Sequence, residues 1–486
     1  MAKPASGYVP RGARARQRAS KGGRRWYADP KLWAVVVFVL GAGGYLGYWR
    51  WERTHHRIVL GKGRAAWGAS FSHDGRYLAV YEPAEKPELE AVVHGYNGAG
   101  DANVRVLPVA GGTVLATFPR AQVWKGSPGP SWGGGRYVLF PTAGGDGWET
   151  RISVGDVHSK VIALSLDGAN GRLSPDGRFV AYERCVEVEP DMVGPYRFYS
   201  RYKPERPEIF VFEISTRDDR QLTADGGYDP VWSPDGRTIL YRRANTTEYM
   251  KQGLAWDRYE PDYDSDGRME APHVYSYKAK RFAGIDLMAI PRDGGEPVAV
   301  AHGGMNAHAA WVGRDSHTVS WVHWDYEPDP IADDGEFGGY RSFAYAFGHA
   351  ADPDTVSLEA SLMMGSAAGG EAEEVLSPAH DAIRLSTARW SRDGQRLVYE
   401  RVISDSTMIV ANRRAGARLG DFKDETDLHL YDRATRRSTR LVGQDDPHRT
   451  QPAWSPDGTR LAYMVHEWEI PQVEIATFDR LVRPTK

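Results

Sequence analysis

A short stretch that recurs along the chain constrains the fold more than any other feature, and its clearest copy is DPVWSPDGRTILYRR, residues 229–243. The aromatic and branched residues on either side of its centre favour β-strands. Between them, Ser233-Pro234-Asp235-Gly236 combines a fixed φ, a side-chain acceptor and a permissive glycine. Two short β runs around such a turn predict a β-hairpin.

The same pattern occurs seven times between residues 67 and 465. One hydrophobic anchor precedes each turn, and the anchors are Phe71, Trp132, Leu173, Trp232, Trp311, Trp390 and Trp454. A second pair of β-like runs follows most hairpins, so each repeat holds four strands. Repeated four-stranded units predict an all-β fold, a β-propeller with WD-like repeats. We expect seven blades, or six if the short second copy, PSWGGGRYVLF, is not a blade of its own.

These repeats resemble those of the TolB-like propeller family, which carry a W-S-P-D-G hairpin and a strand pair of the pattern IYVMD…G…RQLT. The clearest match is 207–236, where PEIFVFEISTRDDRQLT runs on into VWSPDG. The resemblance covers nearly everything after residue 66. The chain is not TolB itself, because it has no recognisable N-terminal α/β domain, its insertions are long and an apolar segment precedes the repeats. Peptidases with similar propellers continue into a hydrolase domain, which we do not expect here.

The N-terminal region divides into a basic arm, an apolar run and a linker. Residues 1–31 hold nine Lys or Arg and one acidic residue, which predicts a disordered arm. Residues 32–49, LWAVVVFVLGAGGYLGYW, carry no charge and are long enough to span a membrane as a helix. No small-x-small site follows, so we expect an uncleaved transmembrane anchor, with Arg24-Arg25 leaving a twin-arginine export signal open. A juxtamembrane linker at 50–64 then leads into the propeller at 65–486.

Charge predicts the orientation of this anchor. Nine basic residues precede the apolar run, and five lie between Arg50 and Arg64. The positive-inside rule then favours a cytoplasmic N-terminus, which makes this a single-pass protein of the inner membrane with a periplasmic or otherwise extracytoplasmic propeller. The chain after position 64 has a net charge of −15. Such a charge disfavours nucleic acid as the partner of the propeller.

Long insertions explain the irregular spacing of the repeats. All of them fall between the second and third strands of a repeat, at 82–103, 184–207, 242–285, 323–355 and 401–427. Because strands alternate in direction, these connections share one face, where long loops are often functional. Their aromatic residues either pack the loops against the disc or form a cap that binds a partner. The residues we expect to bind a partner are Tyr196, Arg197, Tyr199, Arg201, Tyr202, Trp256, Tyr259, Trp324, Tyr326 and Tyr340.

One insertion also contains a candidate metal site. Asp262, Asp264 and Asp266 alternate along the chain and precede Gly267, which lets a loop wrap oxygen ligands around Ca²⁺. The twelfth position is His273 instead of Glu, so the loop is not an EF-hand. The alternative is a solvated acidic turn, and calcium is the only cofactor that the sequence suggests.

The sequence predicts no catalytic residue. The GxSxG string at 129–133 lies on a strand-like anchor, whereas a nucleophile elbow needs a strand, a sharp turn and a helix. Cys185, the single cysteine, follows a β run, where a buried small side chain is the expected role.

Two functions of different class fit these observations. The first is a membrane-anchored module that binds a protein or peptide of the bacterial cell envelope, a kind of partner that the TolB resemblance implies. The second is a propeller enzyme, a metal-dependent hydrolase or lyase whose site lies at the mouth of the channel. We expect the non-enzymatic function.

Overall fold

The structure is a computed structural model that divides the chain into two units, residues 1–55 and residues 56–486. The described residues all belong to the second unit and are 56–60, 64–84, 100–123, 128–143, 150–187, 205–254, 274–324, 361–377, 383–402, 426–441, 449–467 and 470–478. The predicted arm and membrane anchor lie outside these ranges. Within them, no helix is long and apolar enough to cross a membrane.

The described residues form 28 strands, which fall into groups of four along the chain. The first three groups are β2 (Trp67–Phe71), β3 (Tyr77–Pro83), β4 (Gly100–Pro108) and β5 (Ala116–Val123); β6 (Ser131–Gly133), β7 (Tyr137–Ala143), β8 (Thr150–Asp156) and β9 (Val161–Asp167); and β10 (Ala169–Leu173), β11 (Phe179–Glu187), β12 (Glu205–Glu213) and β13 (Asp219–Gln221). The next two are β14 (Tyr228–Trp232), β15 (Thr238–Leu254), β16 (Val274–Pro291) and β17 (Val298–Ala301); and β18 (Met305–Trp311), β19 (Thr318–Trp324), β20 (Ser361–Ser366) and β21 (Ala372–Leu376). The last two are β22 (Ile383–Trp390), β23 (Arg396–Val402), β24 (Thr426–Asp432) and β25 (Arg437–Arg440); and β26 (Arg449–Trp454), β27 (Arg460–Glu467), β28 (Ile470–Thr477) and β1 (His56–Ile58).

Neighbouring strands within every group are antiparallel, which confirms the predicted all-β class for the described residues. Three groups are separate sheets. The other four join in pairs, each through one residue pair, Ala121 with Thr142 and Ile285 with Met305. The groups are therefore nearly independent four-stranded units.

One hydrogen-bond pattern explains why the repeated sequence folds as a hairpin. The hydroxyl of Ser233 donates to Asp235 Oδ1 (2.6 Å) and accepts from the backbone N–H of Thr238 (2.9 Å), while Asp235 Oδ1 also accepts from the N–H of Arg237 (3.1 Å). Gly236 closes the turn at a φ of 70°. The same bonds recur in four further hairpins, at Ser72, Ser174, Ser391 and Ser455.

The anchor tryptophans connect each group to the one before it. The indole N–H of Trp132 donates to the carbonyl of Ser70 (3.1 Å), and that of Trp232 donates to the carbonyl of Arg172 (2.9 Å). Trp311 and Trp454 make corresponding bonds to the carbonyls of Val231 and Arg389, while Trp390 donates to the hydroxyl of Ser320 on β19, the second strand of the preceding group. Because each bond joins neighbouring groups near their first strands, those first strands line a common axis.

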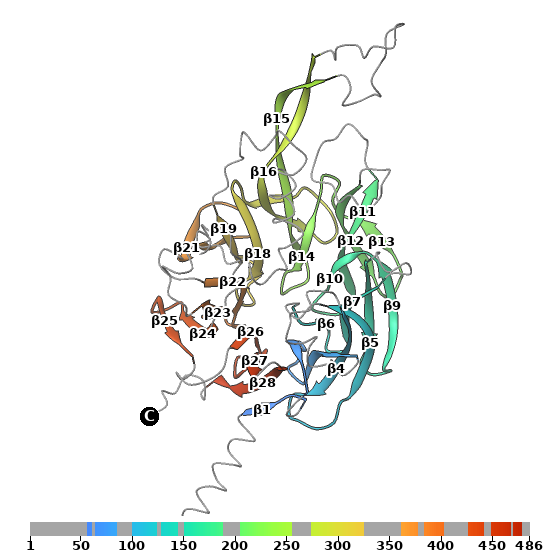
Figure 1. Ribbon diagram of the computed structural model, residues 1–486, viewed down its shortest axis with the longest axis vertical. Helices are drawn as coiled ribbons and strands as arrows, with labels where there is room; N and C mark the ends of the chain where they lie inside the picture. Colours follow the sequence, from blue (N-terminus) through green and yellow to red (C-terminus); the bar gives the residue numbers. More distant parts are fainter. Residues whose placement is uncertain are drawn as a thin grey trace, which may run out of the picture. The chain divides into compact units, whose positions relative to one another are not determined.

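The last group is completed by the start of the second unit. β1 pairs with β28, with Arg57 opposite Ile475, and Figure 1 shows blue β1 beside red β28. The first and last groups also meet through a hydrogen bond from Gly68 N to Gln451 Oε1 (3.1 Å). Pairing between the first and the last described strands protects sheet edges, as in a β-propeller.

The hydrophobic core lies between successive groups. One buried cluster joins Leu139 and Ile152 of the second group to Val180, Tyr182 and Phe210 of the third. Each sheet thus buries its faces against its neighbours, which explains why short strands suffice.

β15 and β16 differ from the sequence expectation, which treated 242–285 as an insertion. Their backbones pair as far as Leu254 and Val274, with one register shift between Asn245 and Thr246. Figure 1 shows this long hairpin extending beyond the other strands. The branched and aromatic residues of this stretch favour strand, a signal that the length of the interruption obscured.

Candidate functional site

The first strand of most groups carries a bulge at one fixed position, three residues before the anchor. The residue there has a left-handed backbone conformation: Asn170 (φ 50°), Asp229 (φ 48°), His308 (φ 52°), Gln451 (φ 53°) and Gly68 (φ 61°). The strand register shifts at each of these places. We call the four polar residues among them the bulge ring. Left-handed non-glycine residues are uncommon and strained, and bulges often re-aim side chains beside functional sites.

Buried carboxylates on the second strands hold the bulge ring in place. Glu183 Oε1 accepts from the side-chain amide of Asn170 (2.8 Å) and from the backbone N–H of Asp229 (2.6 Å). Glu400 Oε1 accepts from the backbone N–H of Gln451 (2.6 Å). Since Glu183 and Glu400 are each almost fully buried, these bonds fix the geometry where neighbouring groups meet.

Electrostatics at the bulge ring centre on Asp229 and His308. Asp229 forms an ion pair with the buried Arg242. Desolvation opposes ionisation of Asp229, but the charges of Arg242 and Arg172 outweigh it and lower the pKa of the carboxyl. Desolvation, together with the charge of Arg242, lowers the pKa of His308 to about 4. At neutral pH the site therefore presents a carboxylate and a neutral imidazole.

Two arginines, Arg172 and Arg389, lie one residue before their anchors. This position is two residues after the bulge ring, so it is on the same face of the strand. Arg172 donates to the carbonyl of Gly171 (3.2 Å), and Arg389 donates to that of Ala388 (2.9 Å). Desolvation and then the charge of Arg172 lower the pKa of Arg389, although Arg389 is exposed to solvent. A side chain that is accessible to water yet surrounded by protein lines an internal channel. The corresponding residues of the other groups are smaller: Ser70, Ser131, Val231, Ala310 and Ala453.

A cavity of about 270 Å³ occupies the end of this channel nearest the hairpin turns. Its wall comes from the first strands of four successive groups and from two of their turns. Ser70, Ser131, Arg172 and Val231 contribute at the position before the anchor, and the anchors themselves also line it. The bulge ring lies at the opposite end of the same strands.

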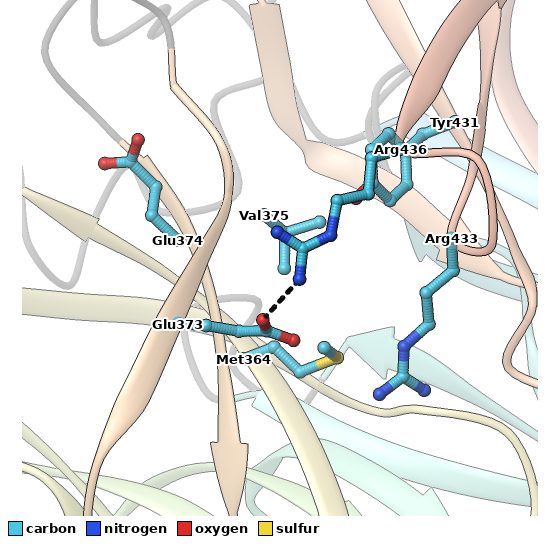
Figure 2. Close-up of a pocket in the computed structure, with 7 residues that line it drawn as sticks. All are labelled: Met364, Glu373, Glu374, Val375, Tyr431, Arg433 and Arg436. Atoms are coloured by element: carbon cyan, nitrogen blue, oxygen red, sulfur yellow. Dashed lines mark hydrogen bonds and ion pairs between the residues drawn. The ribbon is translucent and has the colours of Figure 1, made fainter.

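A second cavity, of about 300 Å³, lies away from the axis, between β21 and the β24–β25 turn. Figure 2 shows Arg436 reaching Glu373, to which it forms an ion pair at 3.3 Å. Tyr431 and Met364 form the apolar part of the wall. Because its lining comes from outer strands of two neighbouring groups, it is separate from the axial channel.

The partner-binding and calcium residues predicted from the sequence lie outside the described residues, with one exception. Trp324 is the last residue of β19, and only its backbone is described. The others lie outside the described ranges: Tyr196, Arg197, Tyr199, Arg201, Tyr202, Trp256, Tyr259, Asp262, Asp264, Asp266, Tyr326 and Tyr340. These interpretations stay predictions.

Three further side chains with chemically reactive groups, Ser131, His323 and Cys185, lie in strands of the fold. Ser131 of the GxSxG string lies in β6, where its hydroxyl accepts from the backbone N–H of Leu173 (3.0 Å). His323 Nδ1 hydrogen-bonds Asn306 Oδ1 (2.9 Å). Cys185 lies half-buried in β11. Within the described ranges, no three His, Cys, Asp or Glu side chains gather in a way that could hold a metal ion.

Sequence reasoning missed the axial residues. Asn170, Asp229, His308 and Gln451 share one spacing from their anchors, as do Arg172 and Arg389. Aligning the repeats on their anchors would have shown polar residues recurring at these positions, although not the left-handed backbone that distinguishes them.

No family model matches the sequence, and no curated protein does either. Solved structures do resemble it. Oligogalacturonate lyase from Vibrio parahaemolyticus is 11% identical with a TM-score of 0.44, over 87% of this chain and 93% of that one. TolB from Acinetobacter baumannii is 13% identical with a TM-score of 0.37, over 81% of this chain and 66% of that one. The β-propeller domain of the Trilobed protease from Pyrococcus furiosus is 9% identical with a TM-score of 0.46, over 87% and 99%. Likeness at this level assigns no activity to the chain.

Proposed function

We propose that this protein is a seven-bladed, TolB-like β-propeller that binds a protein or peptide segment at the bulge-ring end of its axis. The observation that carries the proposal is the bulge ring itself. The register of the first two strands imposes a left-handed backbone at one position in several groups, yet the residue there is different each time: Asn170, Asp229, His308 and Gln451. Because the fold requires only the backbone conformation, side chains that vary at such a bulge are expected to be aimed at a ligand.

The chemistry of the bulge ring suits a polypeptide ligand. Asn170 and Gln451 carry amide side chains, of which Asn170 Nδ2 donates to Glu183 and Gln451 Oε1 accepts from Gly68 N. Neutral His308 supplies one donor and one acceptor, and Asp229 supplies a carboxylate balanced by Arg242. Backbone amides and carbonyls need alternating donors and acceptors of this kind.

Strand topology supports a site at this end of the sheets. β11, β15, β19 and β23 run from the hairpin turns towards it, and each leads to a connection between second and third strands. The predicted aromatic residues belong to three of those connections. We therefore propose that this cap and the bulge ring together form the binding face, and that the aspartate-rich segment at 262–266 stabilises the cap by binding calcium.

The seven-blade count rests on the four-strand groups. The short second copy has Gly133-Gly134-Gly135 in place of the usual turn, and it still begins a group of four strands, β6 to β9. This supports treating it as a blade of its own.

We further propose that residues 32–49 anchor the propeller on the outer side of the inner membrane, where envelope proteins are accessible to it. A reporter that is active only in an oxidising compartment, fused after Lys486, tests this. Activity of a cytoplasmic reporter instead would invert the orientation and remove the proposed class of partner.

Site-specific crosslinking tests the binding face. A photoreactive amino acid replaces Ala244 in the full-length chain in intact cells. Ala244 is partly exposed and lies just beyond the bulge-ring level on β15, toward the connections between second and third strands. Glu296, in the exposed turn before β17, carries the same group as a matched control. We expect a discrete crosslinked envelope protein from position 244 and none from position 296. The same product from both positions, or none from 244, would contradict the proposal.

A further inference from the structure

The axial cavity at the turn end has a wall that is mostly apolar. Phe71, Trp132, Leu173 and Trp232 line it together with Pro130 and Pro175. The indole N–H groups of Trp132 and Trp232 already donate to backbone carbonyls, so these rings present carbon surface to the cavity. An occupant therefore needs an apolar body.

Arg172 supplies the charge in this wall. Among the described residues its guanidinium makes one hydrogen bond, to the carbonyl of Gly171, and no ion pair. Other arginines of the described chain with structural roles are paired with acids, as Arg105 is with Glu82 and Arg136 with Asp156. A guanidinium has five N–H donors, so Arg172 keeps a fork of donors for a ligand.

Arg389 makes an anion at this place more favourable. It occupies the same position in another group, and desolvation together with the charge of Arg172 lowers the pKa of Arg389, so the two guanidinium groups are near enough to repel each other. A ligand that carries one negative charge would relieve this repulsion. Arg389, which does not line the cavity itself, thus adds a second positive charge near it.

Ser131 adds a hydroxyl donor. Its oxygen accepts from the N–H of Leu173, and within the described ranges its own proton goes to no protein acceptor. His73 also lines the cavity, but desolvation and then the charge of Arg392 lower the pKa of its imidazole. It is therefore neutral at pH 7 and adds no positive charge. One guanidinium fork beside one hydroxyl matches a planar, singly charged carboxylate.

We infer that this cavity, lined by Arg172, Ser131 and the anchors Trp132 and Trp232, binds a carboxylate carried on a small apolar body. The carboxylate accepts from the guanidinium and from the serine hydroxyl, and the apolar part lies against the anchor rings. A volume of about 270 Å³ is at the small end for ligand sites, which suits a short acid or the last residue of a peptide. The site lies nearer the turn end of the axis than the bulge ring and uses different side chains, although the charge of Arg172 also acts on Asp229.

Two probes distinguish the sources of such a carboxylate. Hexanoate represents a free acid, and the tripeptide Gly-Gly-Phe represents a peptide C-terminus, with its C-terminal amide as control. Binding to the purified full-length chain in detergent is followed by tryptophan fluorescence and calorimetry. Binding of hexanoate supports a free acid, and binding of the peptide acid without the amide supports a chain terminus. Equal binding of acid and amide, or no binding of either acid at 10 mM, which is about 3 kcal/mol of affinity, would overturn the inference.

Variants separate binding from folding. Arg172→Met should weaken binding of the active probe by about tenfold or more. Its melting temperature should stay close to that of the control, because the repulsion of Arg389 that it removes offsets the attraction to Asp229 that it loses. Arg178→Met is the matched control, since Arg178 lies in the turn of the same hairpin and pairs with Glu213 at the surface. Unchanged binding in Arg172→Met, or a melting temperature that falls well below that of the control, would show that Arg172 serves the fold.

Discussion

The two ends of the first strands differ in how strictly their residues repeat from group to group. At the turn end, five hairpins repeat the same serine and aspartate hydrogen bonds to the same backbone groups. Along the axis, the residue three positions before the anchor is different in almost every group. The repeated bonds make the turn, which every group needs, whereas the varied side chains share only a backbone conformation.

This difference separates residues that specify the fold from residues that are available for binding. A side chain required by the hairpin should be costly to replace in any group. A side chain on the axis should be cheap to replace for stability and costly for binding. The predictions below test that division, from the largest expected effect on stability to the smallest.

The anchors should have the largest effect. Trp232 is nearly buried, packs with Phe179 and donates its N–H to Arg172. Trp232→Ala should destabilise the protein by about 3–5 kcal/mol, because it opens a cavity between two groups. Thermal and urea unfolding measure this, with Trp232→Phe as the variant that removes chiefly the hydrogen bond. If Trp232→Ala lowered the free energy of unfolding by less than Trp232→Phe does, the anchors would not be the residues on which stability chiefly depends.

The turn serines should follow. Ser233 is fully buried, and its hydroxyl serves one acceptor and the N–H of Thr238. Ser233→Ala should cost about 1–3 kcal/mol, since a buried N–H and a carboxylate oxygen lose their partner. Ser455→Ala should cost a similar amount in its own hairpin, while Ser159→Ala at the exposed β8–β9 turn should cost almost nothing. Unequal costs at 233 and 455 would show that the repeated turns are not equivalent.

His308 should give the axis a pH-dependent contribution to stability. Its pKa is about 4 in the folded protein and 6.5 for an ordinary histidine, so the unfolded chain binds the proton first as pH falls. Stability from this group is complete above pH 6.5 and is lost as pH falls towards 4. Arg242, Asp229 and Arg389 are the charges that act on the ring.

The size of this effect is about 1–3 kcal/mol. Unfolding free energies of the wild type and of His308→Asn, measured between pH 4 and pH 7, isolate it, because asparagine tolerates the left-handed conformation that Asn170 already adopts. The variant should have a shallower slope than the wild type. Parallel curves would mean that His308 is not held neutral by its surroundings.

Much of the fold could be predicted from the sequence because its signals are local. The turn residues at 233–236 and the anchor Trp232 lie within a few positions of one another. The four-strand repeat could be predicted in the same way, because its strands and turns follow one another along the chain. The closure by β1 could not be predicted, because three residues, His56 to Ile58, pair with a strand that begins at Ile470.

The candidate site was less predictable for a related reason. Asn and His are enriched among left-handed residues, but residue type alone does not locate the left-handed backbone at Asn170 and His308, since the cross-strand register imposes it. Arg172 and Arg389 are more than 200 positions apart in the sequence, and the arrangement of the four-stranded groups around the axis brings their charges together.

The smallest effect is expected at a left-handed residue away from the axis. Lys160, at the exposed β8–β9 turn, has a φ of 62°. Lys160→Gly should change stability by less than about 1 kcal/mol, because relief of strain offsets the added freedom of the unfolded chain. A larger change would mean that the side chain at a left-handed position contributes to stability even away from the axis.

The central claim is that the bulge ring serves binding and the turns serve folding. The most direct test removes two bulge-ring side chains in the double variant Asn170→Gly with His308→Gly and measures capture of the partner by the crosslinker at position 244. Lys160→Gly is the control. Glycine keeps the left-handed backbone and removes only the side chains. The account predicts that the double variant melts close to the control and captures at least about tenfold less partner. Capture equal to the control, at an equal melting temperature, would contradict it.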